Sequence, residues 1–228
     1  MLLSNNQAAG VDREGSSSVV AGSMSKEILF KFLVIGDYGV GKTAVVRRYT
    51  DGRFSSNYKI TIGADFSMRT LQWDDNTKIN LQLWDIAGHE RFGCMTRVYY
   101  KYAVGAAIVF DLSRTATFQS VRKWLKDLRE KLTLADGEPV PIVLLANKCD
   151  IPGYGVQPEV VTRFCKEQGI QAWFLTSAKT NVNVDKAMQF LVERAMGSRH
   201  REISRESDAI LLNNECNEDN AEKVDICC

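Results

Sequence analysis

One glycine-rich stretch constrains this chain more than any other feature. It reads Gly36-Asp37-Tyr38-Gly39-Val40-Gly41-Lys42-Thr43 and fits the pattern of a glycine, four residues and Gly-Lys-Ser/Thr. The apolar run 28–35 predicts a buried strand before it, and the spacing of 44–49 predicts a helix after it. In that setting, backbone N–H groups wrap around phosphate oxygens at the start of a helix. The alternative is a glycine-rich turn without a ligand, and the flanking elements argue against it.

The residue types at the end of this loop point to a particular ligand. Lys42 can reach the outer phosphates of a nucleotide, and the Thr43 hydroxyl can bind Mg²⁺.

Composition indicates a soluble globular chain with no positive sign of nucleic-acid binding. Of its 228 residues 45% are hydrophobic and 25% charged, and the net charge is only +1. No basic stripe with interleaved aromatic residues is present, so we expect no nucleic-acid partner. The six cysteines form no Cys-x-x-Cys pair, which argues against a zinc site and favours a reducing compartment. No apolar run approaches the ~20 residues of a transmembrane helix.

The order of the periodic segments predicts one α/β domain. Two alternating runs, 64–73 and 78–84, flank a polar turn and predict an antiparallel hairpin. Further strands are predicted at 104–110, 139–146 and 172–175, and helices at 118–132, from Pro158 and from Val184. This pattern predicts a six-stranded, mostly parallel sheet with one antiparallel edge strand and helices on both faces.

The chain divides into three parts. Residues 1–25 are rich in Ser, Gly and Ala and predict a disordered arm, with Met24 as an alternative start. Residues 26–196 form the predicted domain. Residues 197–228 are acidic with few core-forming side chains, so we expect a flexible tether that ends in Cys227-Cys228.

Four polar segments follow predicted strands directly. They are the glycine loop, Asp85 to Gly88, Asn147 to Asp150, and Ser177 to Lys179. Ligands of open α/β sheets bind at this carboxyl edge. Asp85 can hold Mg²⁺, directly or through water, and a carboxylate such as Asp150 selects guanine because adenine would leave it unpaired.

Together these motifs resemble the Rab family of Ras-superfamily small GTPases, over roughly residues 26–196. The resemblance implies a P-loop NTPase G domain that binds GTP or GDP with Mg²⁺. It implies Mg²⁺ ligation by Thr43, Thr61 and Asp85, and catalysis through Lys42, Thr61, Gly88 and His89. The implied nucleotide contacts are Gly36, Asp37, Tyr38, Gly39, Val40, Gly41, Lys42, Thr43, Ala44, Phe54, Tyr58, Thr61, Gly88, Asn147, Lys148, Asp150, Ser177, Ala178 and Lys179.

The same resemblance assigns individual roles. Phe54 would pack on the guanine, Tyr58 would lie over the phosphates, and Asn147 and Asp150 would read the base. Lys148 would lie along the base and ribose, and the Ala178 amide would reach the guanine carbonyl.

Residues 53–63 and 86–99 correspond to the two switch segments of the family. The resemblance implies an effector surface formed by Ile62, Phe66, Trp84, Ile86 and Tyr99. From the residues alone, a core position would be the favoured interpretation of Phe66, Trp84 and Tyr99. The sequences of residues 84–88, with Ile86 where most Rabs have Thr, and of residues 95–100 are similar to those of the Rab subgroup of melanosomes and other lysosome-related organelles.

Two residues depart from the family pattern. His89 stands where a glutamine normally orients the attacking water, and Tyr38 is bulky where many relatives have a small residue. We therefore expect slow intrinsic hydrolysis. The alternatives are that His89 is a switch residue without consequence, or that the protein is a GTP-dependent membrane scaffold with negligible hydrolysis. A P-loop kinase of small molecules is disfavoured because no lid domain fits the length.

The resemblance to the Rab family also implies a modification of the chain end and a set of partners. Cys227-Cys228 would carry two geranylgeranyl groups, which suffice for stable anchoring. The expected partners are an exchange factor, a TBC-type activator, a GDP-dissociation inhibitor and Rab effectors. We expect a monomer on the cytoplasmic face of lysosomal or lysosome-related membranes, with a cytosolic pool.

Overall fold

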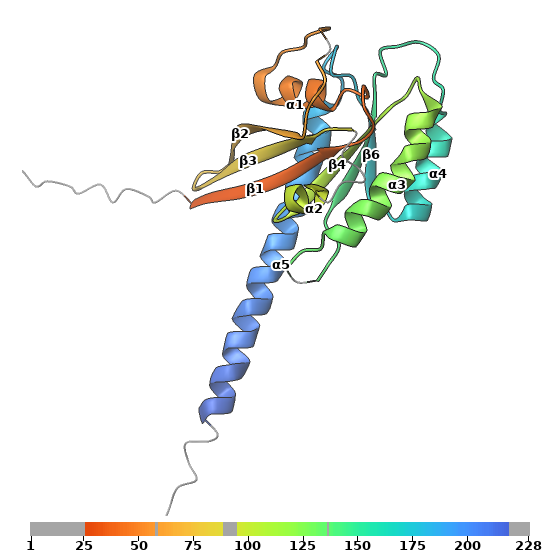
Figure 1. Cartoon of the computed structure of the whole chain (residues 1–228). Coiled ribbons are helices and arrows are strands. Elements are labelled where there is room, and N and C mark those ends of the chain that lie inside the picture. Colours follow the sequence, from red (N-terminus) through yellow and green to blue (C-terminus); the bar gives the residue numbers. More distant parts are fainter. Residues whose placement is uncertain (1–25, 58, 89–94, 136, 219–228) are drawn as a thin grey trace, which may run out of the picture.

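The structure is a computed structural model, and it describes residues 26–57, 59–88, 95–135 and 137–218. Figure 1 shows one twisted sheet with helices on both sides. Six strands are hydrogen-bonded in the order β2-β3-β1-β4-β5-β6. Only β2 and β3 pair antiparallel, and β2 lies at an edge, as the sequence predicts.

The strands carry the burial patterns that their sequences indicate. Their bounds are β1 Lys26–Ile35, β2 Ala64–Asp74, β3 Thr77–Ile86, β4 Gly105–Asp111, β5 Ile142–Asn147 and β6 Ala172–Leu175. Every residue of β4 and β5 is buried, because helices cover both faces of these parallel strands. In β3, buried Ile79, Leu81 and Leu83 alternate with partly exposed residues, as expected for a strand near an open edge.

Two apolar layers sandwich the sheet. Helices α1 (Lys42–Asp51) and α5 (Val184–Glu218) pack on one face, against β1 side chains such as Phe32 and Val34. Helices α2 (Met95–Tyr100), α3 (Thr115–Lys131) and α4 (Pro158–Gln168) cover the other face. The short helix α2 was not predicted, because six residues give too few turns for a periodic signal. This layering places all loops after β1, β3, β4, β5 and β6 at one rim of the sheet.

Helix α5 extends past Gly197, where the sequence predicts the start of a flexible tether. Helix α5 continues without interruption to Glu218 and runs away from the sheet in Figure 1. The segment contains one glycine and no proline, and extending an existing helix adds a hydrogen bond for each residue fixed. Ser204 Oγ also donates to the His200 carbonyl at 3.0 Å within this extension. The composition of residues 197–228 predicts disorder, because composition does not take into account that a helix can propagate from a packed segment.

Within the described ranges, no helix combines the length and the apolar character that a bilayer crossing requires. Cys227 and Cys228 lie outside the described residues.

Candidate nucleotide-binding site

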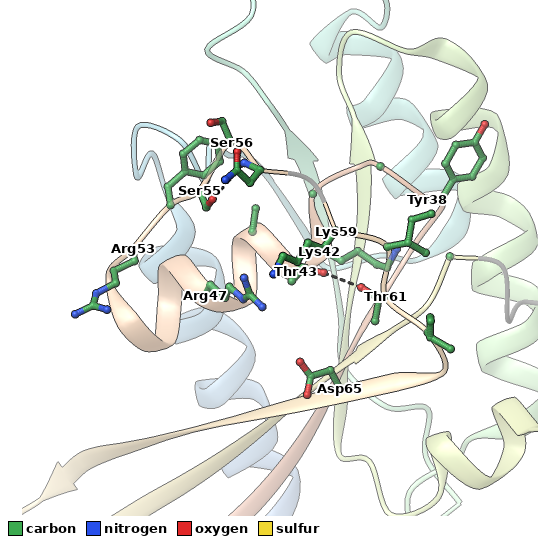
Figure 2. A pocket seen from close by; sticks show the side chains of 18 of the residues that line it. Tyr38, Lys42, Thr43, Arg47, Arg53, Ser55, Ser56, Lys59, Thr61 and Asp65 are labelled. Atoms are coloured by element: carbon green, nitrogen blue, oxygen red, sulfur yellow. Dashed lines mark hydrogen bonds between the residues drawn. The ribbon is translucent and has the colours of Figure 1, made fainter.

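A cavity of about 620 Å³ opens at the rim of the sheet, between the glycine loop, the start of α1 and residues 53–62. Figure 2 shows the side chains of Lys42, Thr43 and Thr61 converging there. Its size matches that of small-molecule and cofactor sites, ~300–1,000 Å³. The predicted site residues that line it are Tyr38, Gly39, Gly41, Lys42, Thr43, Ala44, Phe54, Ile62, Thr61, Gly88 and Lys148. Tyr58 and His89 lie outside the described residues.

The glycines of the loop are required by close approach as well as by backbone angle. A Cβ at Gly36 would lie 2.1 Å from the Val109 carbonyl oxygen, and Gly36 has a φ of +141°. At Gly41, with φ +98°, it would lie 2.5 Å from Asn147 Nδ2. Any side chain at either position would force the loop away from the sheet.

Each of the five consecutive carbonyls from residue 36 to residue 40 accepts a hydrogen bond from a side chain. Lys42 Nζ donates to Gly36 at 2.9 Å and to Asp37 at 3.0 Å. Burial lowers the pKa of Lys42 to about 8, and the Asp85 and Asp37 carboxylates oppose that shift. A bound phosphate would add negative charge and favour the ammonium form further.

Asn147 connects two loops. One is the glycine loop 36–43, which we call the phosphate loop, and the other follows β6 and, with the loop after β5, forms the base-side loops. Its Nδ2 donates to the Val40 carbonyl at 2.8 Å, and its Oδ1 accepts from the Ala178 N–H at 3.3 Å. The side chain is 1% exposed and lies outside the lining of the cavity. In this structure Asn147 therefore holds two loops together, and its contact with the base stays a prediction.

The remaining predicted base contacts gather beside it. Ser177 Oγ donates to Asp150 Oδ1 at 2.6 Å, and Lys179 Nζ lies 4.0 Å from Asp150 Oδ2. They come from the loops after β5 and β6 and do not line the 620 Å³ cavity. The structure thus brings these residues together at the expected rim, next to the cavity and not within its lining.

Three oxygen atoms from three separate elements converge near the phosphate loop. Thr43 Oγ1 donates to Asp85 Oδ2, and Thr61 Oγ1 lies 3.0 Å from Thr43 Oγ1 and 3.3 Å from Asp85 Oδ2. The second carboxylate oxygen, Asp85 Oδ1, is buried and makes no hydrogen bond with the described residues. Burial raises the pKa of Asp85, although the Thr43 hydroxyl and Lys42 counteract it. A hard cation such as Mg²⁺ fits this all-oxygen set and would satisfy the orphaned atom.

Gly88 lies against the phosphate loop through its backbone. A Cβ at this position would meet the Tyr38 nitrogen at 2.3 Å, so only glycine allows this approach. The Tyr38 ring is 56% exposed, and Figure 2 shows it pointing away from Lys42 and Thr43. In this conformation the ring lies at the rim of the cavity and leaves its centre open.

The residues predicted to form an effector surface differ in their exposure. Phe66 and Trp84 stack at a centroid distance of 5.8 Å, and Phe66 and Ile62 are exposed. Tyr99 is half-buried. Ile86, however, is 0% exposed and belongs to the core under α2 and α3. The prediction that it lies at the surface is wrong: Ile86 is on the same face of β3 as Trp84, and the core cluster that includes residues of α2 and α3 buries it.

Two residues at the rim were missed from the sequence. Asp111 ends β4, and Arg114 follows three positions later; the two form an ion pair at 2.9 Å beside the phosphate loop. A polar residue ending an apolar strand is the signal that identified Asn147, and the same signal was present at Asp111.

Comparison with known proteins identifies the family. Residues 31–197 match the Ras family. The chain is 50% identical to the Ras-related protein Rab-32 of Homo sapiens over 90% of this chain and 91% of the relative. It is 54% identical to Rab-32B of Dictyostelium discoideum, over 74% of this chain and 65% of that relative. It is 48% identical to human Rab-7L1, over 78% and 88%. The chain therefore belongs to the Ras family and, within it, to the Rab small GTPases, which hydrolyse GTP and act in membrane traffic.

Proposed function

We propose that this protein is a switch that cycles between GDP- and GTP-bound forms at the 620 Å³ cavity, with Mg²⁺ held by Thr43, Thr61 and Asp85. The convergence of these three side chains carries the proposal. They come from α1, the loop 52–63 and β3, and only Thr61 lies on a segment without regular structure. When bound, Mg²⁺ would neutralise charge on the phosphates.

The chain's own residues supply the rest of the phosphate chemistry. Lys42 and the amides of the glycine loop would stabilise negative charge that develops as water attacks the last phosphate in line. No side chain need act as a strong base. Thr61 and the Gly88 N–H would hold the last phosphate, and its loss would release both switch segments. Effectors that bind only the ordered form would then read the nucleotide state.

Guanine selectivity is the part of the proposal that depends on the base-side loops. The Asp150 carboxylate is oriented by Ser177 and suits the N1–H and N2 donors of guanine. Competition of GTP and ATP against a fluorescent GDP analogue tests this directly. We expect GTP but not ATP to displace the analogue, and Asp150→Asn should weaken the displacement by GTP. Equal displacement by ATP would contradict the proposal.

The hydrolysis rate depends on His89, which replaces the usual glutamine. We propose slow intrinsic turnover that a TBC-type activator can accelerate, since in this family such activators supply both an arginine and a glutamine. Phosphate release with and without an activator separates a slow switch from a scaffold that holds GTP permanently.

The proposed location rests on the cysteine pair 227–228 and on similarity to relatives. We propose two geranylgeranyl groups on Cys227 and Cys228 and a place on lysosomal or lysosome-related membranes, supported by similarity to Rab-32 and Rab-7L1. An exchange factor, a GDP-dissociation inhibitor and effectors would complete the cycle. Replacing both cysteines by serine should leave the protein in the cytosol, and membrane retention would contradict the anchor.

A further inference from the structure

Asp111 has a buried carboxylate, and one of its oxygen atoms accepts hydrogen bonds from two cationic side chains, those of Arg114 and Lys148. Its side chain is 2% exposed, and its Oδ2 accepts from Arg114 Nε at 2.9 Å and from Lys148 Nζ at 2.7 Å. The other oxygen, Oδ1, accepts from the Ser113 N–H at 3.0 Å and the Ser113 hydroxyl at 2.6 Å. Both oxygens are therefore committed, and the two cations are held in fixed places.

Each cation also donates to the phosphate loop. Arg114 Nη2 donates to the Tyr38 carbonyl at 3.1 Å, although the two residues are 76 positions apart. Lys148 Nζ donates to the next carbonyl, that of Gly39, at 2.7 Å. A single buried carboxylate thus fixes the donors for two successive peptide units.

Holding a carbonyl also orients the neighbouring N–H group. The described residues contain no cis peptide bond, and in a trans peptide the C=O and the following N–H point in opposite directions. With the Tyr38 carbonyl held by Arg114, the Gly39 N–H points to the side away from the guanidinium. A charged donor on the carbonyl also polarises the peptide and makes that N–H a better donor. Gly39 lines the cavity.

We propose that Arg114 is a positioning residue for the bound nucleotide, which orients and polarises the Tyr38–Gly39 peptide toward the phosphates and is itself held by Asp111. This inference rests on the proposed binding of a guanine nucleotide. Lys148 shares the arrangement, but Arg114 is the better test because it has no expected contact with the base. It sits just before α3, and its side chain stays partly exposed.

The test compares Arg114→Ala and Arg114→Lys with Arg129→Ala. Arg129 is a matched control, because it lies at the far end of α3 and donates to the Gln168 carbonyl, away from the loop. The measurements are the release rate of a fluorescent GDP analogue in Mg²⁺, the ³¹P chemical shifts of bound nucleotide, and the melting temperature of each protein.

We expect Arg114→Ala to release nucleotide on the order of fivefold faster, the lower end of typical coupling between sites. Its ³¹P shifts should move, Arg114→Lys should restore part of the effect, and Arg129→Ala should match the wild type. If Arg114→Ala lowers only the melting temperature and leaves release and ³¹P shifts unchanged, the proposal is wrong. Should Arg114→Ala fail to fold, a wild-type release rate and spectrum for Arg114→Lys and Arg114→Gln would overturn it. Failure of the wild type to bind the analogue would instead contradict the proposed function.

Discussion

The hydroxyl oxygens of Thr43 and Thr61 lie 3.0 Å apart, although the residues are separated by 18 positions and belong to different elements. Thr43 is fixed in α1, whereas Thr61 lies in a segment without regular structure. Both approach the same oxygen of Asp85. A side chain held on a helix and one held on an irregular segment therefore meet at one carboxylate, as a phosphate-sensing loop would require.

This arrangement predicts different metal dependence for the two threonines. Thr43→Ala should raise the Mg²⁺ concentration needed for tight binding of both GDP and GTP, by about tenfold or more. Thr61→Ala should do so only with GTP, because Thr61 is expected to close on the metal in the triphosphate state. Mg²⁺ titrations of nucleotide release measure both effects, with Thr50→Ala in α1 as the control. Identical behaviour of the two variants would refute the separation of roles.

Replacing His89 by glutamine should accelerate hydrolysis. An amide can orient the attacking water with a donor and an acceptor in one plane, which the imidazole does not reproduce. We expect a higher single-turnover rate for His89→Gln with unchanged GTP affinity. Equal rates in the two proteins would show that this position does not limit hydrolysis.

Ile86 and Phe66 should differ in their contribution to stability, although the family resemblance predicts both on one surface. Ile86 is buried in the core, so Ile86→Ala should lower the free energy of unfolding by ~2–5 kcal/mol. Phe66 is exposed and, among the described residues, stacks on Trp84, so Phe66→Ala should lower it by ~1 kcal/mol. Urea unfolding measures both, and equal losses would mean that our distinction between core and surface is incorrect.

The helical extension after Gly197 should be separable from the domain. Ser204→Pro should break this part of α5 and reduce the helical circular dichroism, because proline costs ~3 kcal/mol in a helix interior. The melting temperature of the domain should stay the same, since Ser204 is exposed and lies beyond Met196, the last residue of α5 in the core cluster. Ser204→Ala is the matched control. An unchanged spectrum would indicate that the segment is not helical in solution.

Cys165 should resist alkylation in the folded protein. Burial raises the pKa of its thiol to about 11, so at pH 8 only about one molecule in a thousand carries the thiolate. The fraction increases as pH rises toward that pKa, and unfolding returns the thiol to its ordinary range. Peptide-resolved mass spectrometry with iodoacetamide should show labelling at least ~100-fold slower than in urea. Comparable rates would place Cys165 outside the core.

The sequence predicted those parts of the fold and of the site that a local residue pattern determines. The glycine loop, the alternation in 64–84 and the polar strand ends predicted the sheet and its functional rim. Features that depend on distant contacts were not predictable in this way. The contact of Arg114 with Tyr38 spans 76 positions, and the burial of Ile86 depends on residues of α2 and α3 that pack on its face of the sheet. The extension of α5 was missed because composition does not report helix propagation.

The most direct test of the central claim is hydrogen exchange of residues 53–63 and 86–99 in protein loaded with GDP or with a non-hydrolysable GTP analogue, both with Mg²⁺. If Thr61 and Gly88 sense the last phosphate, amides in both segments should exchange more slowly in the triphosphate form. The rest of the sheet should be unaffected. Exchange that is the same in the two forms would contradict the account of this protein as a nucleotide-dependent switch.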